Sequence, residues 1–150
     1  MRSQMVIFIA GMAIFLSIPQ WSRAQWVETG HPKGGWITDF AVIGISIFAS
    51  TREGGVFLST DNGSSWKAVN SGLPKRADFQ CLAVCGQNLF AGSVGRGTFL
   101  STNNGNSWKA INSGLPENSS VWCLAVSGTN LFAVAGSKVA SVFLSTDNRI

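Results

Sequence analysis

In most of this chain, apolar residues occur in short runs that are separated by turns containing glycine and asparagine. The clearest series covers residues 79–85, 88–93, 97–102 and 107–112. An Asn104-Gly105 pair joins the last two runs, and this dipeptide favours the type I′ turn of a β-hairpin. No long stretch repeats apolar residues at the spacing of a helix. The pattern therefore predicts four antiparallel strands in an all-β fold.

The same pattern recurs along the chain at a step of 42 residues. Residues 57–74 and 99–116 are identical at 15 of 18 positions, and a third copy of their start begins at Phe143, after 44 residues. Four-stranded units that recur every ~40–45 residues are typical of the blades of a β-propeller. We therefore predict a partial β-propeller of about three four-stranded blades, with repeats at about 36–77, 78–119 and 120–150.

The register of the repeats defines the two ends of this array. Residues 27–32 align with residues 69–74, so we expect the chain to enter at a fourth strand, at about residues 26–29. That strand would form the outer edge of a blade whose other three strands come at the far end of the chain. Propellers close with roughly four to eight blades, and three blades leave apolar faces open. Self-association through these faces and a truncated product of a longer gene are both interpretations of this shortage.

Each repeat carries a short motif between its third and fourth strands. Residues 59–66 read STDNGSSW, residues 101–108 read STNNGNSW, and residues 145–150 read STDNRI. The first copy matches the Asp-box pattern S-x-D-x-G-x-[ST]-W at every fixed position. On these residues the chain resembles the secreted Asp-box (BNR) repeat β-propellers, a superfamily that includes sialidases, sortilin-type receptors and photosystem II assembly factors. The resemblance covers about residues 26–150 and implies the fold, but the superfamily shares no single activity.

The motif residues are expected to shape the turn. The Asp61 carboxylate can accept hydrogen bonds from backbone N–H groups, as in an Asx-turn, and Gly63 allows a positive φ. A cation site at Asp61 is the alternative, and Asn103 at the equivalent place argues against it because an amide brings no negative charge. We therefore predict no metal and no cofactor. The structural set comprises Ser59, Asp61, Gly63, Trp66, Ser101, Asn103, Gly105, Trp108, Ser145 and Asp147.

The N-terminal residues have the plan of a secretory signal peptide. Arg2 precedes an apolar run of 14 residues at 5–18, and Ser22 and Ala24 supply small side chains at the −3 and −1 positions of a cleavage site. The alternative is a membrane anchor, but a spanning helix needs about 20 apolar residues. We therefore predict a signal peptide at 1–24 and a secreted, periplasmic or cell-surface protein that contacts the membrane only through that peptide.

Charge and composition argue against several classes of function. The 11 Lys and Arg residues exceed the 7 Asp and Glu residues by four, and removal of residues 1–24 takes away Arg2 and Arg23, which leaves a net charge of +2. A nearly neutral chain is not expected to bind nucleic acid. The sialidase mechanism that the resemblance implies needs a Tyr nucleophile and an Arg cluster. The chain has no Tyr and its Arg residues are scattered, so we predict no catalytic residue and no enzymatic activity.

Asp39 and the three cysteines occupy related positions in the repeats. Asp39 takes the place of Cys81 and Cys123 on the first strand, which lines the central channel of a propeller. Its carboxylate is therefore expected to face the channel and to meet water, or alternatively an ion. Cys81 and Cys85 lie too far apart along one strand for a disulfide. We predict that all three cysteines are buried as small apolar residues without disulfides.

A basic loop face is the candidate binding surface. The connections between blades and the hairpins between second and third strands share one side of a propeller, and they carry Lys33, Arg52, Lys75, Arg76, Arg96 and Lys138. Only Glu53, Asp78 and Glu117 oppose these six cations. The excess can steer an acidic glycan or protein segment, although charged loop tips also keep a β-protein in solution.

We expect an exported, non-catalytic propeller module that binds a protein or glycan. One alternative is a fragment of a sialidase-like glycoside hydrolase whose catalytic residues lie outside this chain. The other is a photosystem II assembly factor-like scaffold, which only the shared repeat supports.

Overall fold

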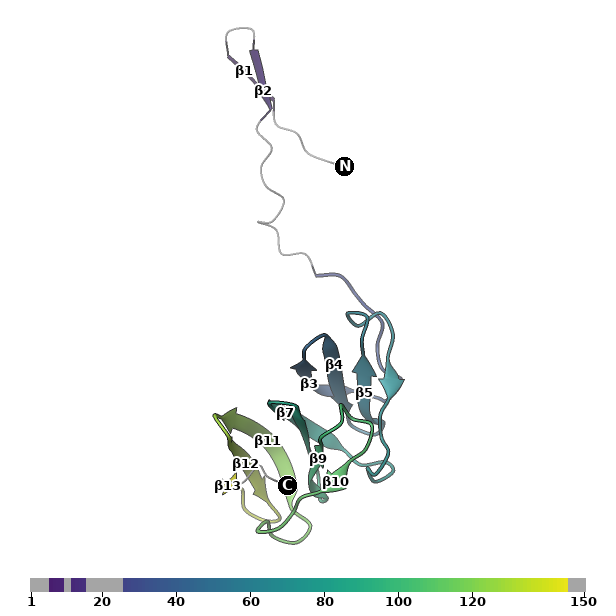
Figure 1. Ribbon diagram of the computed structural model, residues 1–150, viewed down its shortest axis with the longest axis vertical. Helices are drawn as coiled ribbons and strands as arrows, with labels where there is room; N and C mark the ends of the chain where they lie inside the picture. The colour runs from purple at the N-terminus through teal and green to yellow at the C-terminus, as the bar shows by residue number, and fades with distance from the viewer. Residues whose placement is uncertain (1–5, 10–11, 16–25, 146–150) are drawn as a thin grey trace.

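The computed structural model describes the backbone of residues 6–9 and 12–15 and the whole of residues 26–145. All regular elements in this part are β-strands (Figure 1), which confirms the predicted all-β class. β1 (Val6–Ile9) and β2 (Met12–Phe15) form a separate hairpin. The rest of the predicted signal peptide lies outside the described residues, and its export role stays a prediction. Within the described part, no helix has the length and hydrophobicity needed to cross a membrane.

Three antiparallel sheets follow the N-terminal hairpin, and in each sheet the strands pair in chain order. The first sheet contains β3 (Ile37–Ile43), β4 (Ser46–Thr51), β5 (Gly55–Ser59) and β6 (Lys67–Ala68). The middle sheet contains β7 (Phe79–Cys85), β8 (Asn88–Ser93), β9 (Gly97–Ser101) and β10 (Lys109–Ala110). The third sheet contains β11 (Ser120–Ser127), β12 (Asn130–Gly136) and β13 (Ser141–Ser145).

The fourth strands are much shorter than the sequence pattern predicts. We expected a strand at 107–112, and β10 has only 2 residues. The reason is local, because the Asn103 side chain donates a hydrogen bond to the Ser107 hydroxyl and accepts one from the Ser107 N–H, which hold Ser107 in the preceding turn. The fourth strand then pairs with β9 at two positions, Lys109 with Leu100 and Ala110 with Phe99, before the chain turns toward the third sheet.

The predicted entry strand at residues 26–29 is wrong for this structure, since residues 26–30 belong to no strand. A strand needs a neighbour for its backbone hydrogen bonds. The expected neighbour was β13, and β13 lies at the opposite end of the row of sheets (Figure 1). The N-terminal segment instead lies against the first sheet, where the carbonyl oxygen of Gly30 accepts a hydrogen bond from Nε1 of Trp66 at 3.0 Å.

The sheets stack through their first strands, since β3 packs on β7 and β7 packs on β11. One apolar cluster fills the junction between the first and middle sheets, and Phe79 and Phe99 meet there edge to face at 5.9 Å. A second cluster, with Phe90, Leu100 and Val121, fills the junction between the middle and third sheets. Each sheet is apolar on both faces, so the middle sheet is covered twice and the outer two once.

A β-bulge interrupts each first strand at the same repeat position, which the sequence analysis did not predict. The extra residues are Thr38, Gln80 and Trp122. A bulge bends its strand and redirects the side chains around it. In the first sheet the redirected Thr38 hydroxyl donates a hydrogen bond to the backbone oxygen of Phe79 at 2.6 Å and so links two sheets.

Candidate functional site

The loop face is built by hairpins that lie against the connections between sheets. The backbone N–H of Arg52, in the β4–β5 hairpin, donates to the oxygen of Trp36 at 3.0 Å. In the middle sheet, Val94 N–H donates in the same way to the oxygen of Asp78 at 2.9 Å. The repeated bond places hairpin tips and connections on one side of the molecule.

The six cations that the sequence assigns to this face are all exposed: Lys33, Arg52, Lys75, Arg76, Arg96 and Lys138. Nε of Arg52 lies 3.7 Å from Oδ2 of Asp78, and this is the one ion pair within the described residues. The Arg52 guanidinium also lies 5.5 Å from the centre of the exposed Trp36 ring. An exposed pair of this kind contributes little stability, so its main effect is to neutralise one charge of the face.

The first Asp-box turn, residues 59–66, is held by a network around Asp61. Oδ1 of Asp61 accepts hydrogen bonds from the Ser59 hydroxyl at 2.8 Å and from the Ser65 N–H at 2.9 Å. Oδ2 accepts the Ser65 hydroxyl at 2.6 Å. The Ser59 oxygen in turn accepts the N–H of Gly63 at 2.8 Å. Both oxygens of the Asp61 carboxylate therefore accept hydrogen bonds that shape the turn.

This network lowers the pKa of Asp61 from 3.8 to about 2. The largest cause is the hydrogen bond from the Ser65 side chain, followed by the bonds from the Ser65 backbone and from Ser59. All of them stabilise the ionised carboxylate.

The second turn, residues 101–108, has the same backbone but a different donor. Oδ1 of Asn103 accepts the Ser107 N–H at 2.9 Å, as Asp61 does with Ser65. Nδ2 of Asn103 donates to the Ser107 hydroxyl at 2.8 Å, so the direction of the side-chain bond is reversed. The Ser101 oxygen accepts the N–H of Gly105 at 2.8 Å, as the Ser59 oxygen does with Gly63. An amide therefore replaces the carboxylate without loss of the turn.

The tryptophans of the two turns lie in different surroundings. Trp108 is 6% exposed, and its Nε1 donates to the oxygen of Val69 in the preceding repeat at 2.7 Å. Trp66 is only half-buried, between Gly30 and the exposed ring of Phe40. In the third copy Ser145 is half-buried at the end of β13, and Asp147 lies outside the described residues.

Asp39 links two sheets. Its Oδ2 accepts the Leu82 N–H of the middle sheet at 2.8 Å, and its Oδ1 accepts the adjacent Phe40 N–H at 2.8 Å. The expectation that this carboxylate meets channel water or an ion therefore missed its protein partners. Sequence reasoning could not find them, because they depend on how β3 lies against β7.

The cysteines differ in exposure, which corrects the prediction that all three are buried. Cys81 is buried, Cys85 is half-buried and Cys123 is exposed, and no disulfide joins them. Burial raises the pKa of the Cys81 thiol to about 12. Val121 of the third sheet covers Cys81, with its oxygen 3.8 Å from Sγ. No described residue covers Cys123 in the same way, because the third sheet has one outer face without a neighbour.

Two asparagines that the sequence analysis passed over fasten the chain after each fourth strand. Oδ1 of Asn70 accepts the Val56 N–H at 2.7 Å, and Oδ1 of Asn112 accepts the Thr98 N–H at 2.7 Å. Their amide groups donate to the oxygens of Gly54 and Arg96. The sequence does carry a signal for them, because Asn occupies this same position in both repeats. Among the described residues, no cluster of three or more His, Cys, Asp or Glu side chains is placed to hold a metal ion.

Neither the protein-family comparison nor the comparison with curated proteins gave a match. Solved structures do match. An ancestral GH74 enzyme aligns at 25% identity with a TM-score of 0.58, over 69% of this chain and 14% of its own. YCF48 from Cyanidioschyzon merolae aligns at 15% identity with a TM-score of 0.62, over 81% of this chain and 37% of its own. The GH74 xyloglucanase from Xanthomonas campestris aligns at 16% identity with a TM-score of 0.52, over 67% of this chain and 19% of its own.

The chain folds as adjacent blades of a β-propeller. These likenesses and the three stacked meanders agree on that fold. The chain spans 14%, 37% and 19% of the lengths of the three structures. The likeness reaches no further than architecture, because one propeller fold carries many unrelated functions.

Proposed function

We propose that this protein is an exported, non-catalytic propeller module whose loop face binds an acidic glycan or an acidic protein segment. The observation that carries the proposal is the set of six exposed cations in the hairpins and inter-blade connections of the three blades. Only Arg52 is held in an ion pair among the described residues. Cations that have no local partner raise the local concentration of an acidic ligand and contribute to its capture.

The chemistry of the acidic residues supports a role without catalysis. Asp39, Asp61 and Asp78 are each occupied by structural hydrogen bonds or an ion pair. Glu53 and Glu117 lie at exposed loop positions. A general acid needs an environment that raises its pKa, and hydrogen bonds shift the pKa of Asp61 downward. Export rests on the sequence pattern of residues 1–24.

The test is binding to immobilised heparin and polygalacturonate, with neutral dextran as the reference. We expect retention on the acidic glycans and not on dextran, and replacement of Arg76 by Asn together with Arg96 by Ser should weaken binding about tenfold. Asn suits position 76 because the backbone there has a positive φ of 55°.

The matched control removes the same charge elsewhere. Lys67→Ser with Lys109→Ser changes two exposed residues of the fourth strands and should leave glycan binding nearly unchanged. Equal loss in both double variants would show that net charge, and not the loop face, drives the interaction. No retention of the unaltered protein on either acidic glycan, or on polyglutamate, would reject the proposal.

A second candidate, a fragment of a glycoside hydrolase, is favoured by the GH74 enzymes among the similar structures. Incubation with xyloglucan and analysis of reducing ends distinguishes the two. We expect no hydrolysis by this chain, and hydrolysis that survives repurification would favour the enzyme.

A further inference from the structure

The junction between the first and middle blades shows how one blade closes on the next. Trp108 of the middle blade lies on the segment that follows β6: its Nε1 donates to the oxygen of Val69 at 2.7 Å and its N–H to the oxygen of Ser71 at 2.9 Å. A Cβ at Gly72 would lie 2.3 Å from the oxygen of Trp108, so only glycine fits there. The segment after a fourth strand is therefore the seat for an aromatic side chain of the next blade.

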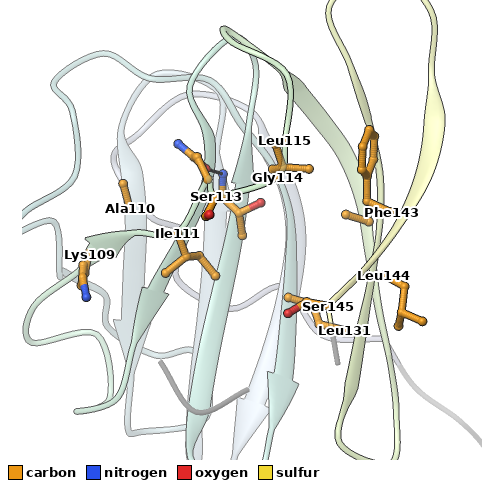
Figure 2. A pocket seen from close by; sticks show the side chains of 13 residues that line it. Lys109, Ala110, Ile111, Ser113, Gly114, Leu115, Leu131, Phe143, Leu144 and Ser145 are labelled. Carbon is orange, nitrogen blue, oxygen red and sulfur yellow. Dashed lines mark hydrogen bonds between the residues drawn. The ribbon is translucent and has the colours of Figure 1, made fainter. Parts of the chain in front are cut away.

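The same seat exists between the middle and third blades, and there no described side chain fills it. Ile111, Ser113 and Gly114 repeat Val69, Ser71 and Gly72. They border a groove of about 420 Å³ whose other wall is formed by Leu131 and Phe143 (Figure 2). Among the described residues, a Cβ at Gly114 would have nothing within 4 Å, although the residue has a positive φ of 85°, close to the 90° of Gly72 in the filled seat.

β13, which lines this groove, also has an open edge. Among the described strands it pairs only with β12. In the middle blade, Phe99 and Leu100 pair with Ala110 and Lys109 of a fourth strand. Their equivalents Phe143 and Leu144 have no such partner within the described residues, and Leu144 is 52% exposed. Among the described residues, neither a fourth strand nor a large side chain fills this groove.

The N-terminal segment of the chain matches what the groove lacks. Residues 26–29 align with residues 68–71, the end of a fourth strand and the residues after it. Trp26 is 98% exposed and Val27 is 71% exposed. Trp26 stands two residues beyond the Trp position of the motif, so in an extended strand it faces the same side. Within one chain the segment lies against the first blade and β13 lies on the third (Figure 1).

Exposed apolar side chains gather at both ends of the array, where no further blade lies among the described residues. The middle blade contributes only Val94 to the set of exposed large hydrophobic residues. The N-terminal segment and first blade contribute Trp26, Val27, Trp36, Ile37, Phe40, Val42 and Ile45, and the third blade contributes Trp122, Val139, Val142 and Leu144. Patches of this kind mark surfaces that bind another protein.

We propose that residues 26–29 of one copy add to β13 of a second copy as its fourth strand and place Trp26 in the groove. The repeats supply the expected bonds. Val69 N–H donates to the oxygen of Val56 at 2.9 Å, and Val27 N–H of one copy donates in the same way to the oxygen of Val142 in the other. In the first blade, Oδ1 of Asn70 accepts the Val56 N–H. At the equivalent positions, the carboxylate of Glu28 accepts the N–H of Val142 in the other copy.

Two copies joined in this way make a closed ring. Each copy offers one donor segment and one open groove, so the contact is head to tail, and such contacts form rings when the rotation closes. The three blades described in each copy add up to six, within the range of roughly four to eight at which propellers close. The inference concerns the edges of the blades and does not depend on the ligand of the loop face.

The first test is the mass in solution of the chain produced with its own N-terminus, so that processing in the host occurs. We expect the mass of two chains. Trp26→Asp should weaken association at least about tenfold, with an unchanged circular dichroism spectrum because Trp26 is exposed in the single chain. Val94→Asp, on the middle blade, is the control and should leave the dimer intact.

The second test fixes the register by cross-linking. In a Cys123→Ser background, Val27→Cys with Val142→Cys should form a covalent dimer on mild oxidation. Ile45→Cys with Val142→Cys should not, because Ile45 lies in the β3–β4 turn, on the side away from the hairpin that precedes β13. A monomer at all concentrations, a dimer that Trp26→Asp leaves unchanged, or equal cross-linking of both pairs would overturn the proposal.

Discussion

The first and middle blades are identical at 15 of 18 positions from residues 57 and 99 onward, yet among the described sheets only the middle one is covered on both faces. Phe79, at the start of β7, is fully buried, whereas Ile37 at the same repeat position is 40% exposed. β7 packs between β3 and β11, and β3 packs on β7 alone among the described sheets. Burial in this fold is therefore supplied by the next blade, and equivalent repeat positions are buried to different extents according to their place in the array.

The largest expected effect of this difference is at the two motif tryptophans. Trp108→Ala removes a buried ring and its bond to Val69, and should lower the free energy of unfolding by about 3–5 kcal/mol. Trp66→Ala should cost less than about 2 kcal/mol, because much of that ring already meets solvent. Urea unfolding at one fixed protein concentration measures both. Equal losses would mean that the first blade is covered as fully as the middle one.

The next effect concerns the link between the two blades. Asp39→Ala leaves the Leu82 N–H without its acceptor and should destabilise the protein by about 1–2 kcal/mol. Asp39→Asn keeps an acceptor oxygen and should recover most of that loss in the same unfolding assay. If Asp39→Ala proves neutral, the bond to Leu82 is not what joins the blades.

The smallest effect distinguishes the two turns by pH. The ionised form of Asp61 is favoured in the folded state, since its pKa lies near 2 and not at 3.8. Its contribution to stability is full above about pH 4 and is lost as the pH falls toward 2. Asp61→Asn, which copies the turn at Asn103, should have a flatter stability profile over this range. Parallel profiles for the two proteins would show that the carboxylate bonds do not persist in solution.

The strand pattern of the middle blade was predictable nearly to the residue. The sequence runs 79–85 and 88–93 coincide with β7 and β8, because alternating apolar residues and glycine turns depend on local chemistry alone. The fourth strand was overestimated, since the side chain of Asn103 extends the turn. The six predicted cations are exposed in hairpins and connections between blades, and their role as one binding face stays a prediction.

Positions that depend on a neighbouring blade were not predictable in the same way. Asp39 and Cys81 occupy one repeat position, yet Asp39 bridges to Leu82 while Cys81 lies buried beneath Val121. Cys123, at the same position again, is exposed. A pattern along one chain reports which side chains share a face, and it does not report whether another sheet lies over that face.

By itself, the sequence determined the repeat, the strand order within each blade and the chemistry of the turns, since all of these arise from residues close together in the chain. The tertiary structure alone decided which apolar faces are buried. It also decided that residues 26–29 pair with no strand in the described part of the chain, and that no described residue fills the seat beside β13. The physical reason is that a blade buries its surface only against another blade, and contact between blades joins residues about one repeat apart.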